Sequence, residues 1–291
     1  MAEEQRVAEF KRYTVRLAQI APVLGDVQAN LERHLELIAA AQRDGVRAII
    51  FPELSLTGYY LRDLVPDVAL PLTSPVLAKL AEASRDISVS AGFVEQTPRF
   101  SFHVAQGFFE GGRLVHVHEK TYLPTYGMFD EERYLSRGNR IEAFDCSLGR
   151  LALMMCEELW HPSAVYLAAL QGISLMIGVA SSPGRGLSDE GLAVQATYER
   201  MLPLYAELFQ VNCIFVNRVG YEDGVNFWGG SQAYAAGGRL LARAPTFEEA
   251  IVDVEIDEGA VRRARVSTPL LSDERPHFTL RELRRILNER A

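Results

Sequence analysis

The chain has 291 residues, of which 48% are hydrophobic and 23% are charged, as in an ordinary globular protein. This composition excludes disordered, collagen-like and disulfide-scaffold chains. The net charge of −8 argues against a nucleic-acid partner, because contact with phosphate backbones requires clustered Lys and Arg. No linker-like segment interrupts the chain. We therefore expect a single domain over residues 1–291, with a core at about 14–258 and a C-terminal extension at 259–291 that contains a helix.

The three cysteines, Cys146, Cys156 and Cys213, are too few and too scattered for a disulfide framework, which favours a reducing compartment. The first residues lack the apolar core of a signal peptide. No apolar run reaches the ~18 to 20 residues that a membrane span needs. We therefore expect a cytoplasmic protein without a membrane segment.

The first half of the chain alternates strand-like apolar runs with segments of helical apolar spacing. The predicted strands are 14–20, 48–51 and 87–95, and the predicted helices are 27–42 and 76–86. Two further strands are expected on either side of a Gly111-Gly112 turn, which makes the sheet mixed.

The second half repeats this alternation. The predicted strands are 151–155, 175–180, 213–217 and 250–256, and the predicted helices are 163–171, 187–209 and 279–289. A polar loop with Gly220, Gly224, Gly229 and Gly230 is expected before a hairpin of residues 231–236 and 239–244. The pattern predicts an α/β fold with about a dozen strands.

Three reactive side chains follow apolar strands, where α/β folds place their sites. Glu53 comes after a buried strand in IIFPELSLTGYY, Lys120 closes the strand in VHVHEKTYLP, and Cys156 ends the strand in LALMMCEELW. Taken singly, a solvated Glu, a solvated Lys and a buried structural Cys are the commoner interpretations. Together they supply a thiol nucleophile, a base for its proton and a cation for an oxyanion.

Other kinds of site find less support in the sequence. The six histidines form no recognisable Cys-His motif, and His161 is interpreted as a cap or packing residue. His116 and His118 share one strand face and could be half of a metal site, but a solvated face is the better interpretation because further ligands are missing. The Gly-rich stretches match no phosphate-binding fingerprint, and a Ser nucleophile elbow is absent.

The order Glu, Lys, Cys in FPELSLTGY, HEKTYLP and MMCEELW resembles the nitrilase, or carbon-nitrogen hydrolase, superfamily. The blocks are similar in particular to the glutaminase domain of glutamine-dependent NAD synthetases, and the similarity extends over about residues 14–258, including IFVNRVG and GGSQAY. The resemblance implies a four-layer αββα sandwich with two mixed sheets, commonly assembled as a homodimer or a higher homo-oligomer. It implies neither a metal nor an organic cofactor.

Carried over to this sequence, the resemblance implies roles for four residues. Glu53 would be the general base, Lys120 would stabilise the tetrahedral intermediate together with the backbone N–H of Glu157, and Cys156 would be the nucleophile that forms a thioester. A second carboxylate orients the Lys in many members. Glu131 is the candidate for it, and Glu132 is the alternative.

Substrate recognition is less constrained by the sequence. The candidate substrate-binding residues are Tyr59, Tyr126, Glu157, Ser181, Ser182 and Arg185. Arg185 would meet an α-carboxylate, whereas Ala-Ser-Ser-Pro-Gly at 180–184 departs from the Asn-Ala-Ser-Pro-Phe of relatives. We expect an amidase for a small linear carboxamide such as glutamine. The alternatives are an ammonia-supplying glutaminase subunit for a separate synthetase, since no ATP-using domain is evident and the chain alone is not expected to make NAD, and a non-catalytic oligomeric scaffold.

Overall fold

The computed structural model describes residues 10–188 and 191–290, and two six-stranded mixed sheets form its centre. The first sheet has the order β16-β1-β2-β3-β4-β5 and the second has the order β15-β14-β11-β8-β7-β6. The strands of the first sheet are β1 (Arg12–Gln19), β2 (Ala48–Ile50), β3 (Ser88–Gln96), β4 (Phe102–Glu110), β5 (Arg113–Glu119) and β16 (Ala250–Asp257). Those of the second are β6 (Ala143–Cys146), β7 (Gly149–Met155), β8 (Leu175–Ala180), β11 (Asn212–Asn217), β14 (Gln232–Tyr234) and β15 (Leu240–Arg243).

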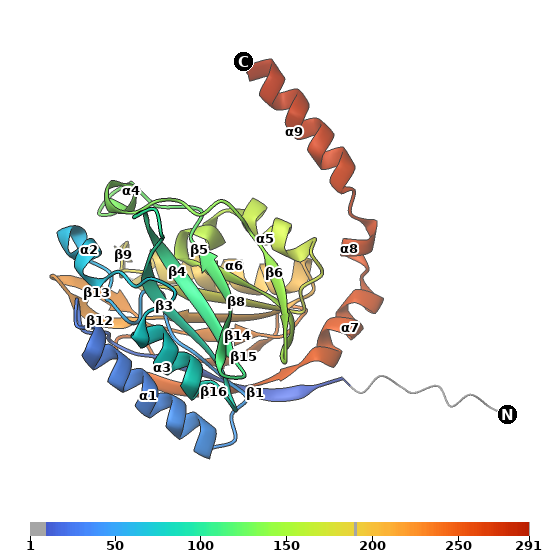
Figure 1. Ribbon diagram of the computed structural model, residues 1–291. Helices are drawn as coiled ribbons and strands as arrows, with labels where there is room; N and C mark the ends of the chain where they lie inside the picture. The colour runs from blue at the N-terminus through green and yellow to red at the C-terminus, as the bar shows by residue number, and fades with distance from the viewer. Residues whose placement is uncertain (1–9, 189–190, 291) are drawn as a thin grey trace.

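Helices cover the outer face of each sheet (Figure 1). The longer ones are α1 (Val27–Arg43), α3 (Pro75–Ala83), α5 (Pro162–Ala169) and α6 (Ala193–Leu208). The chain ends in α7 (Glu258–Ser267), α8 (Leu270–Asp273) and α9 (Pro276–Arg290). The shorter elements are η1 (Arg62–Leu64), α2 (Val65–Val68), α4 (Glu131–Tyr134), η2 (Cys156–Trp160), β9 (Leu187–Ser188), β10 (Gly191–Leu192), β12 (Val219–Glu222) and β13 (Val225–Trp228).

The residue alternation within single strands explains the four layers. In β7, Leu151, Leu153 and Met155 pack into the core between the two sheets, whereas Ala152 and Met154 face the helices α5 and α6. Successive side chains of a strand point to opposite faces, so a strand that is apolar at every position is covered on both sides. The predicted αββα sandwich with two mixed sheets is therefore confirmed.

Several sequence predictions differ from the structure in detail. The predicted helix 187–209 begins only at Ala193, because Leu187–Ser188 and Gly191–Leu192 form a small antiparallel pair; residues 189 and 190 lie outside the described part. The predicted polar loop with four glycines is the hairpin of β12 and β13, in which Gly224 provides the positive φ of the turn. The strand β6 and the helix α7 were not predicted from the sequence.

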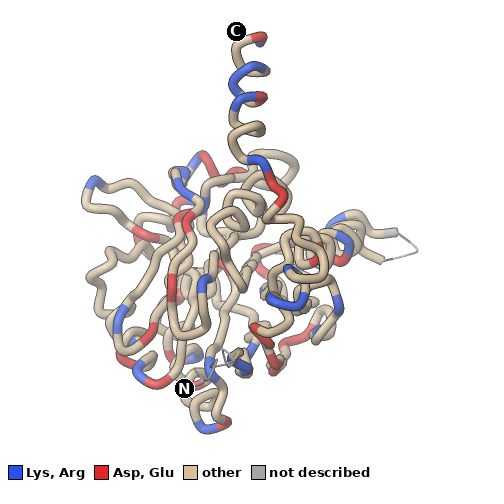
Figure 2. The backbone as a smooth tube through the Cα atoms, turned by 90° about the vertical axis from the view of Figure 1, so that its right-hand side faces the viewer, with Lys and Arg blue, Asp and Glu red and all other residues tan. Residues whose placement is uncertain are grey.

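The C-terminal helix α9 lies apart from the layers, whereas α7 packs against the body of the protein through Val261 and Arg265. Figure 1 shows α9 leading away from the sheets, and Leu283 and Leu287 of α9 are 52% and 64% exposed. Figure 2 shows charged residues in the loops, at the periphery of the fold and along α9. Within the described residues, no helix is both long and apolar enough to cross a lipid bilayer.

Candidate active site

The three candidate catalytic residues come from both sheets. Glu53 follows β2, which is parallel to both of its neighbours β1 and β3, and Lys120 follows β5 in the same sheet. Cys156 follows β7 of the second sheet, which is parallel to β8. The packing of the two sheets face to face brings these strand exits toward one another.

Lys120 lies at the centre of a buried polar cluster. Its Nζ donates to Glu53 Oε1 at 2.6 Å and to Glu131 Oε1 at 2.9 Å. The side chains of Lys120 and Glu53 are 0% exposed, and that of Glu131 is 6% exposed. Buried charges are tolerated when they are paired and hydrogen-bonded. The Lys120 ammonium is paired with two carboxylates, which compensates the cost of burying its charge.

The ionisation of this cluster follows from its burial and its charges. Burial alone would lower the pKa of Lys120, but the Glu131 and Glu53 carboxylates outweigh it and raise the pKa well above the usual range. Burial raises the pKa of Glu131 to about 7, although the Lys120 ammonium opposes this shift. Lys120 therefore stays cationic at neutral pH, whereas Glu131 can gain or lose a proton there.

The structure distinguishes the two acidic candidates at the start of α4. Glu131 points inward, and its Oε1 also accepts a hydrogen bond from the Tyr59 hydroxyl at 2.5 Å. Its Oε2 is buried and has no hydrogen-bond partner among the described residues, so it is the oxygen on which a proton would reside. Glu132 instead pairs with Arg137 near the surface. Of the two, Glu131 is the carboxylate that reaches Lys120.

The second carboxylate oxygen of Glu53 is held from the other sheet. Ser181, just after β8, donates its backbone N–H to Glu53 Oε2 at 2.7 Å and its hydroxyl to the Glu53 carbonyl at 2.8 Å. The neighbouring Ser182 donates its N–H to Asn217 Oδ1 at 2.9 Å. Both serines are buried and engaged in supporting contacts, and a substrate-binding role for them stays a prediction.

Cys156 has a strained backbone and a mostly apolar environment. Its φ of 43° lies in the left-handed region that favours glycine, a conformation that costs energy for other residues. The Sγ lies 3.9 Å from the hydroxyl of Tyr198, which accepts a hydrogen bond from Trp160 Nε1 at 3.1 Å. Burial raises the pKa of the Cys156 thiol, and the Glu53 carboxylate raises it further. The resting thiol is therefore protonated and needs a base before it can attack.

A fully buried glutamate, Glu158, connects Lys120 and Cys156 through the backbone. Its Oε1 accepts bonds from the N–H and the hydroxyl of Thr121, both at 2.7 Å. Its Oε2 accepts the N–H of Met155 at 2.7 Å and pairs with His118 Nε2 at 2.8 Å. One carboxylate thus fixes the residue after the Lys and the residue before the Cys. This role of Glu158 was not predicted from the sequence, although the acidic pair that follows Cys156 was a possible signal for it.

A second group of predicted residues gathers next to the thiol. Tyr126 donates its hydroxyl to Glu157 Oε2 at 2.8 Å. The guanidinium carbon of Arg185 lies 5.5 Å from the centre of the Tyr126 ring and 4.6 Å from that of Phe129. The Glu157 carboxylate, the Arg185 guanidinium and two aromatic rings therefore lie in one region. Phe129 was not among the substrate-binding residues predicted from the sequence.

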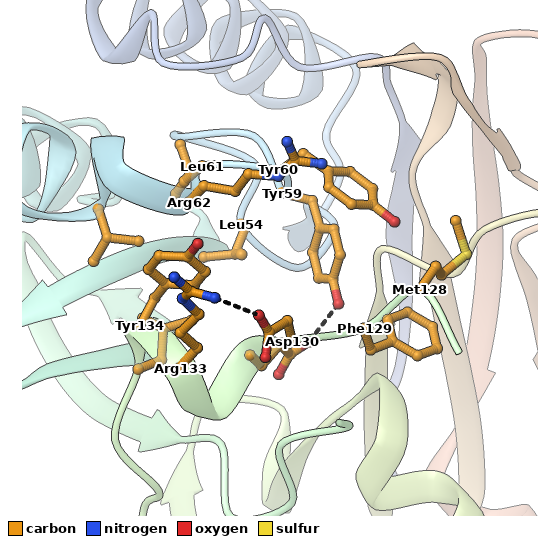
Figure 3. Close-up of a pocket in the computed structure, with 13 residues that line it drawn as sticks. Leu54, Tyr59, Tyr60, Leu61, Arg62, Met128, Phe129, Asp130, Arg133 and Tyr134 are labelled. Carbon is orange, nitrogen blue, oxygen red and sulfur yellow. Dashed lines mark hydrogen bonds and ion pairs between the residues drawn. The ribbon is translucent and has the colours of Figure 1, made fainter. Parts of the chain in front are cut away.

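A cavity of about 350 Å³ borders the polar cluster (Figure 3). It lies between the segment after Glu53 and the α4 segment, and both Tyr59 and Glu131 contribute to its wall. The other lining residues are Leu54, Tyr60, Leu61, Arg62, Val65, Met128, Phe129, Asp130, Arg133, Tyr134 and Leu135. Within this wall the Tyr59 hydroxyl donates to Glu131, the carboxylate that also accepts from Lys120, so the cavity and the polar cluster share these two side chains.

The prediction that His116 and His118 lie on a solvated strand face is wrong. His118 is 3% exposed and bonded to Glu158, and His116 stacks on Phe144 with its ring centre 4.2 Å away. The core between the sheets extends to this strand, where His118 is buried and His116 is half-buried. Burial lowers the pKa of His116 to about 4. Among the described residues, no group of three or more His, Cys, Asp or Glu side chains is arranged to hold a metal ion.

The other two cysteines lie away from the cluster. Cys213 is buried in β11 against α6, and Cys146 is half-buried at the end of β6. Burial raises the pKa of each thiol to about 12. They remain packing residues in our interpretation.

The sequence was compared with protein-family models, and the model described as carbon-nitrogen hydrolase matches residues 14–266. The chain belongs to the carbon-nitrogen hydrolase family. This membership, together with the fold, shows a C–N hydrolase enzyme and confirms the family resemblance of the Glu, Lys and Cys segments.

Three similar proteins show how much of this chain is shared with known relatives. The glutamine-dependent NAD(+) synthetase of Thermotoga maritima is 29% identical over 253 residues, which are 85% of this chain and 42% of that protein. The structure of the Acinetobacter baumannii glutamine-dependent NAD+ synthetase has a TM-score of 0.77 at 27% identity and covers 86% of this chain and 47% of its own. A carbon-nitrogen hydrolase from Helicobacter pylori G27 has a TM-score of 0.81 at 24% identity, covering 94% and 99% of the two chains. The chain of this article therefore spans less than half the length of each of the two synthetases.

Proposed function

We propose that this enzyme is an amidase that hydrolyses a small linear carboxamide, with glutamine as the first candidate, through a thioester on Cys156. The observation that carries the proposal is the buried Glu53–Lys120–Glu131 cluster beside a protonated thiol. A base, a cation and a nucleophile are the three groups that acyl transfer from an amide requires.

The proposed reaction has two halves. Cys156 Sγ attacks the amide carbon as its proton passes to Glu53, and Lys120 stabilises the oxygen that becomes negative. The C–N bond then breaks, the proton on Glu53 goes to the departing nitrogen, and ammonia leaves a thioester behind. Water attacks the thioester carbon while Glu53 takes its proton, the C–S bond then breaks to release the acid, and the proton on Glu53 returns to the sulfur to restore the thiol.

The region around Arg185 supports a substrate with both charges, as in an amino acid amide. The Glu157 carboxylate could accept an α-ammonium, and the Arg185 guanidinium could pair with an α-carboxylate. Arg185 Nε is buried, and no residue in the part of the chain that the structure describes accepts a hydrogen bond from it, which favours a ligand acceptor there. The Tyr126 and Phe129 rings hold this guanidinium from their faces.

A panel of amides and nitriles, with ammonia as the readout, tests the substrate class. We expect glutamine to be hydrolysed with a lower KM than propionamide, and we expect Arg185→Met to remove that difference. A lower KM for propionamide in the unmodified enzyme would exclude a glutamine site. Ammonia release that persists in Cys156→Ser would contradict the thioester mechanism.

The second candidate function is an ammonia-supplying glutaminase subunit that acts with a separate synthetase. It is supported by the similarity to less than half the length of glutamine-dependent NAD synthetases. Glutaminase activity that rises when an ATP-dependent amidotransferase partner is added would favour this role. Activity that is high alone and unchanged by the partner would favour the independent amidase.

We also propose a homodimer or a higher homo-oligomer in the cytoplasm, where reducing conditions would keep Cys156 as a thiol. The outer face of α5 and α6 exposes large apolar side chains, Leu167 at 50%, Leu204 at 48% and Leu208 at 44%. Exposed apolar surface of this kind marks association surfaces. Light scattering of the purified protein, compared with Leu204→Glu, tests the assembly.

A further inference from the structure

Arg218 of the IFVNRVG segment and Glu222 form a buried ion pair near the active site. The proposed reaction uses neither of these two charged groups. Arg218 follows β11 and is 0% exposed, and it pairs with Glu222 at the end of β12, which is 5% exposed. The Arg218 guanidinium carbon lies 4.2 Å from the centre of the Phe227 ring. A buried pair of this kind adds little net stability, because desolvation offsets the attraction of the charges. Its position relative to the site is therefore the informative feature.

Glu222 reaches across to the segment that carries Tyr59. Its Oε1 accepts the backbone N–H of Tyr59 at 2.7 Å and that of Tyr60 at 2.6 Å, while Oε2 faces Arg218. Gly58, which precedes them, has a φ of 80°, and a Cβ there would lie 2.9 Å from Glu222 Oε2. The carboxylate thus fixes two successive amides of a tightly packed turn.

The same tyrosine extends into the catalytic cluster. The Tyr59 ring packs edge-on against Phe227, with ring centres 6.0 Å apart, and its hydroxyl donates to Glu131 Oε1. That oxygen also accepts the ammonium of Lys120. A continuous series of polar contacts therefore runs from Arg218 through Glu222, Tyr59 and Glu131 to Lys120.

We propose that Glu222 is a positioning residue for the hydrolytic reaction: it holds the Tyr59 amide so that the Tyr59 hydroxyl fixes Glu131, and thereby Lys120, for the attack by Cys156. Arg218 supplies the charge that keeps the Glu222 carboxylate in place. The inference rests on the proposed amidase function. A displacement of catalytic groups by about 1 Å can cost roughly 10²-fold in rate, so a residue without substrate contact can govern kcat.

A double-mutant cycle of Glu222→Met, which has no oxygen to accept the Tyr59 and Tyr60 amides, and Tyr59→Phe separates positioning from general structural support. Two rates are measured in each variant: kcat for ammonia release, and the rate at which iodoacetamide alkylates Cys156, followed by mass spectrometry. The second readout needs no substrate, so it tests the inference even if none of the amides in the panel is hydrolysed. Thermal unfolding of each variant reports whether the fold is retained.

We expect Glu222→Met to lower kcat by about 10- to 100-fold and to slow alkylation by about tenfold, while changing KM less than about threefold. In the Tyr59→Phe background the same substitution should lower kcat by less than about threefold, because the hydroxyl through which it acts is already gone. An equal loss in both backgrounds, or no loss in either, would overturn the proposal.

Glu222→Met leaves Arg218 as an unpaired buried charge, and this variant could fail to fold. The paired variant Arg218→Met/Glu222→Met removes both charges and the acceptor of the two amides, and it serves as the second test. It should show the same loss of kcat in the original background and the same small effect beside Tyr59→Phe. A paired variant that folds with unchanged kcat would also overturn the proposal.

Discussion

Glu53 and Lys120 come from the first sheet and Cys156 from the second, and the two halves of the site are held very differently. The Glu53–Lys120–Glu131 cluster has a hydrogen bond on almost every polar atom, with distances of 2.5 to 2.9 Å. The thiol half consists of a sulfur 3.9 Å from the Tyr198 hydroxyl, on a backbone with a positive φ.

This difference has a chemical reason. Groups that stabilise charge act best when they are fixed in advance, because no reorganisation is then needed in the transition state. A nucleophile has to move toward the substrate and change its protonation state, which a dense hydrogen-bond network would oppose. We infer that the polar half is preorganised and that the thiol half is left free to react.

The largest expected effect comes from removing Glu53, the proposed general base. Glu53→Gln keeps the size of the side chain but cannot take the Cys156 proton, so we expect kcat for ammonia release to fall by about 10³-fold. Steady-state kinetics on the amide selected from the panel measure this loss. Glu95→Gln is the matched control, because Glu95 is a buried carboxyl on β3 outside the cluster. A similar loss in the control would remove the special role of Glu53.

Glu131→Gln should have a smaller effect, because the amide oxygen can still accept from Lys120 and Tyr59. The new NH2 group would occupy the position of Oε2, which has no hydrogen-bond partner within residues 10–188 and 191–290, and it would perturb the cluster. We expect a loss of about 10- to 100-fold in kcat. Glu132→Gln on the same helix, whose side chain pairs with Arg137, should stay within about twofold of the original enzyme. Equal losses at the two positions would contradict the assignment.

The preorganised half also rests on a neutral buried histidine, which predicts a pH dependence of stability. His34 Nδ1 donates to the Asn30 carbonyl at 2.7 Å, and Nε2 lies 2.9 Å from the Ser55 hydroxyl, two residues after Glu53. Burial lowers the pKa of His34 from 6.5 to about 4. The unfolded chain therefore binds more protons between these values, and stability falls as the pH falls through this window.

We expect the free energy of unfolding to lose about 2 kcal/mol between pH 7 and pH 5 through His34 alone. Urea unfolding at both pH values measures the loss, and His34→Gln should reduce the pH dependence by this amount. His277→Gln, at an exposed position on α9, should leave it unchanged. An undiminished pH dependence in His34→Gln would show that His34 titrates normally.

The smallest effect is expected on the thiol side. Tyr198→Phe removes a long sulfur contact and the acceptor of the Trp160 N–H, so we expect at most a few-fold change in kcat and about 1 kcal/mol of destabilisation. Tyr205→Phe on the same helix, which loses a hydrogen bond to the Leu159 carbonyl, is the structural control. A loss in Tyr198→Phe as large as that in Glu53→Gln would mean that the thiol half is also preorganised.

Much of this arrangement could be predicted from the sequence, because apolar alternation determines the strands and reactive residues follow them. The order of Glu53, Lys120 and Cys156 in the chain points to the family, and the family resemblance favours Glu131 over Glu132, which agrees with the contact of Glu131 with Lys120. The histidines show the limit, since His116 and His118 look like an exposed polar pair until the second sheet covers them.

The contacts that support the site could not be predicted from the sequence, and the reason is physical. Glu158 and Glu222 act through backbone amides of Met155, Thr121, Tyr59 and Tyr60, and a backbone amide leaves no mark in a residue pattern. The helix starting at Ala193 was predicted too long because apolar spacing does not show where a short strand pair interrupts it. Tertiary contacts override local propensity at both kinds of position.

Trapping the acyl intermediate tests the central claim most directly. The purified enzyme is mixed with the amide that it hydrolyses fastest, quenched in acid within the first turnovers, and digested for peptide mass spectrometry. The account predicts the mass of the acyl group on the peptide that contains Cys156, and its absence from Cys156→Ser. An acyl adduct on Cys146 or Cys213, or continued ammonia release by Cys156→Ser, would contradict it.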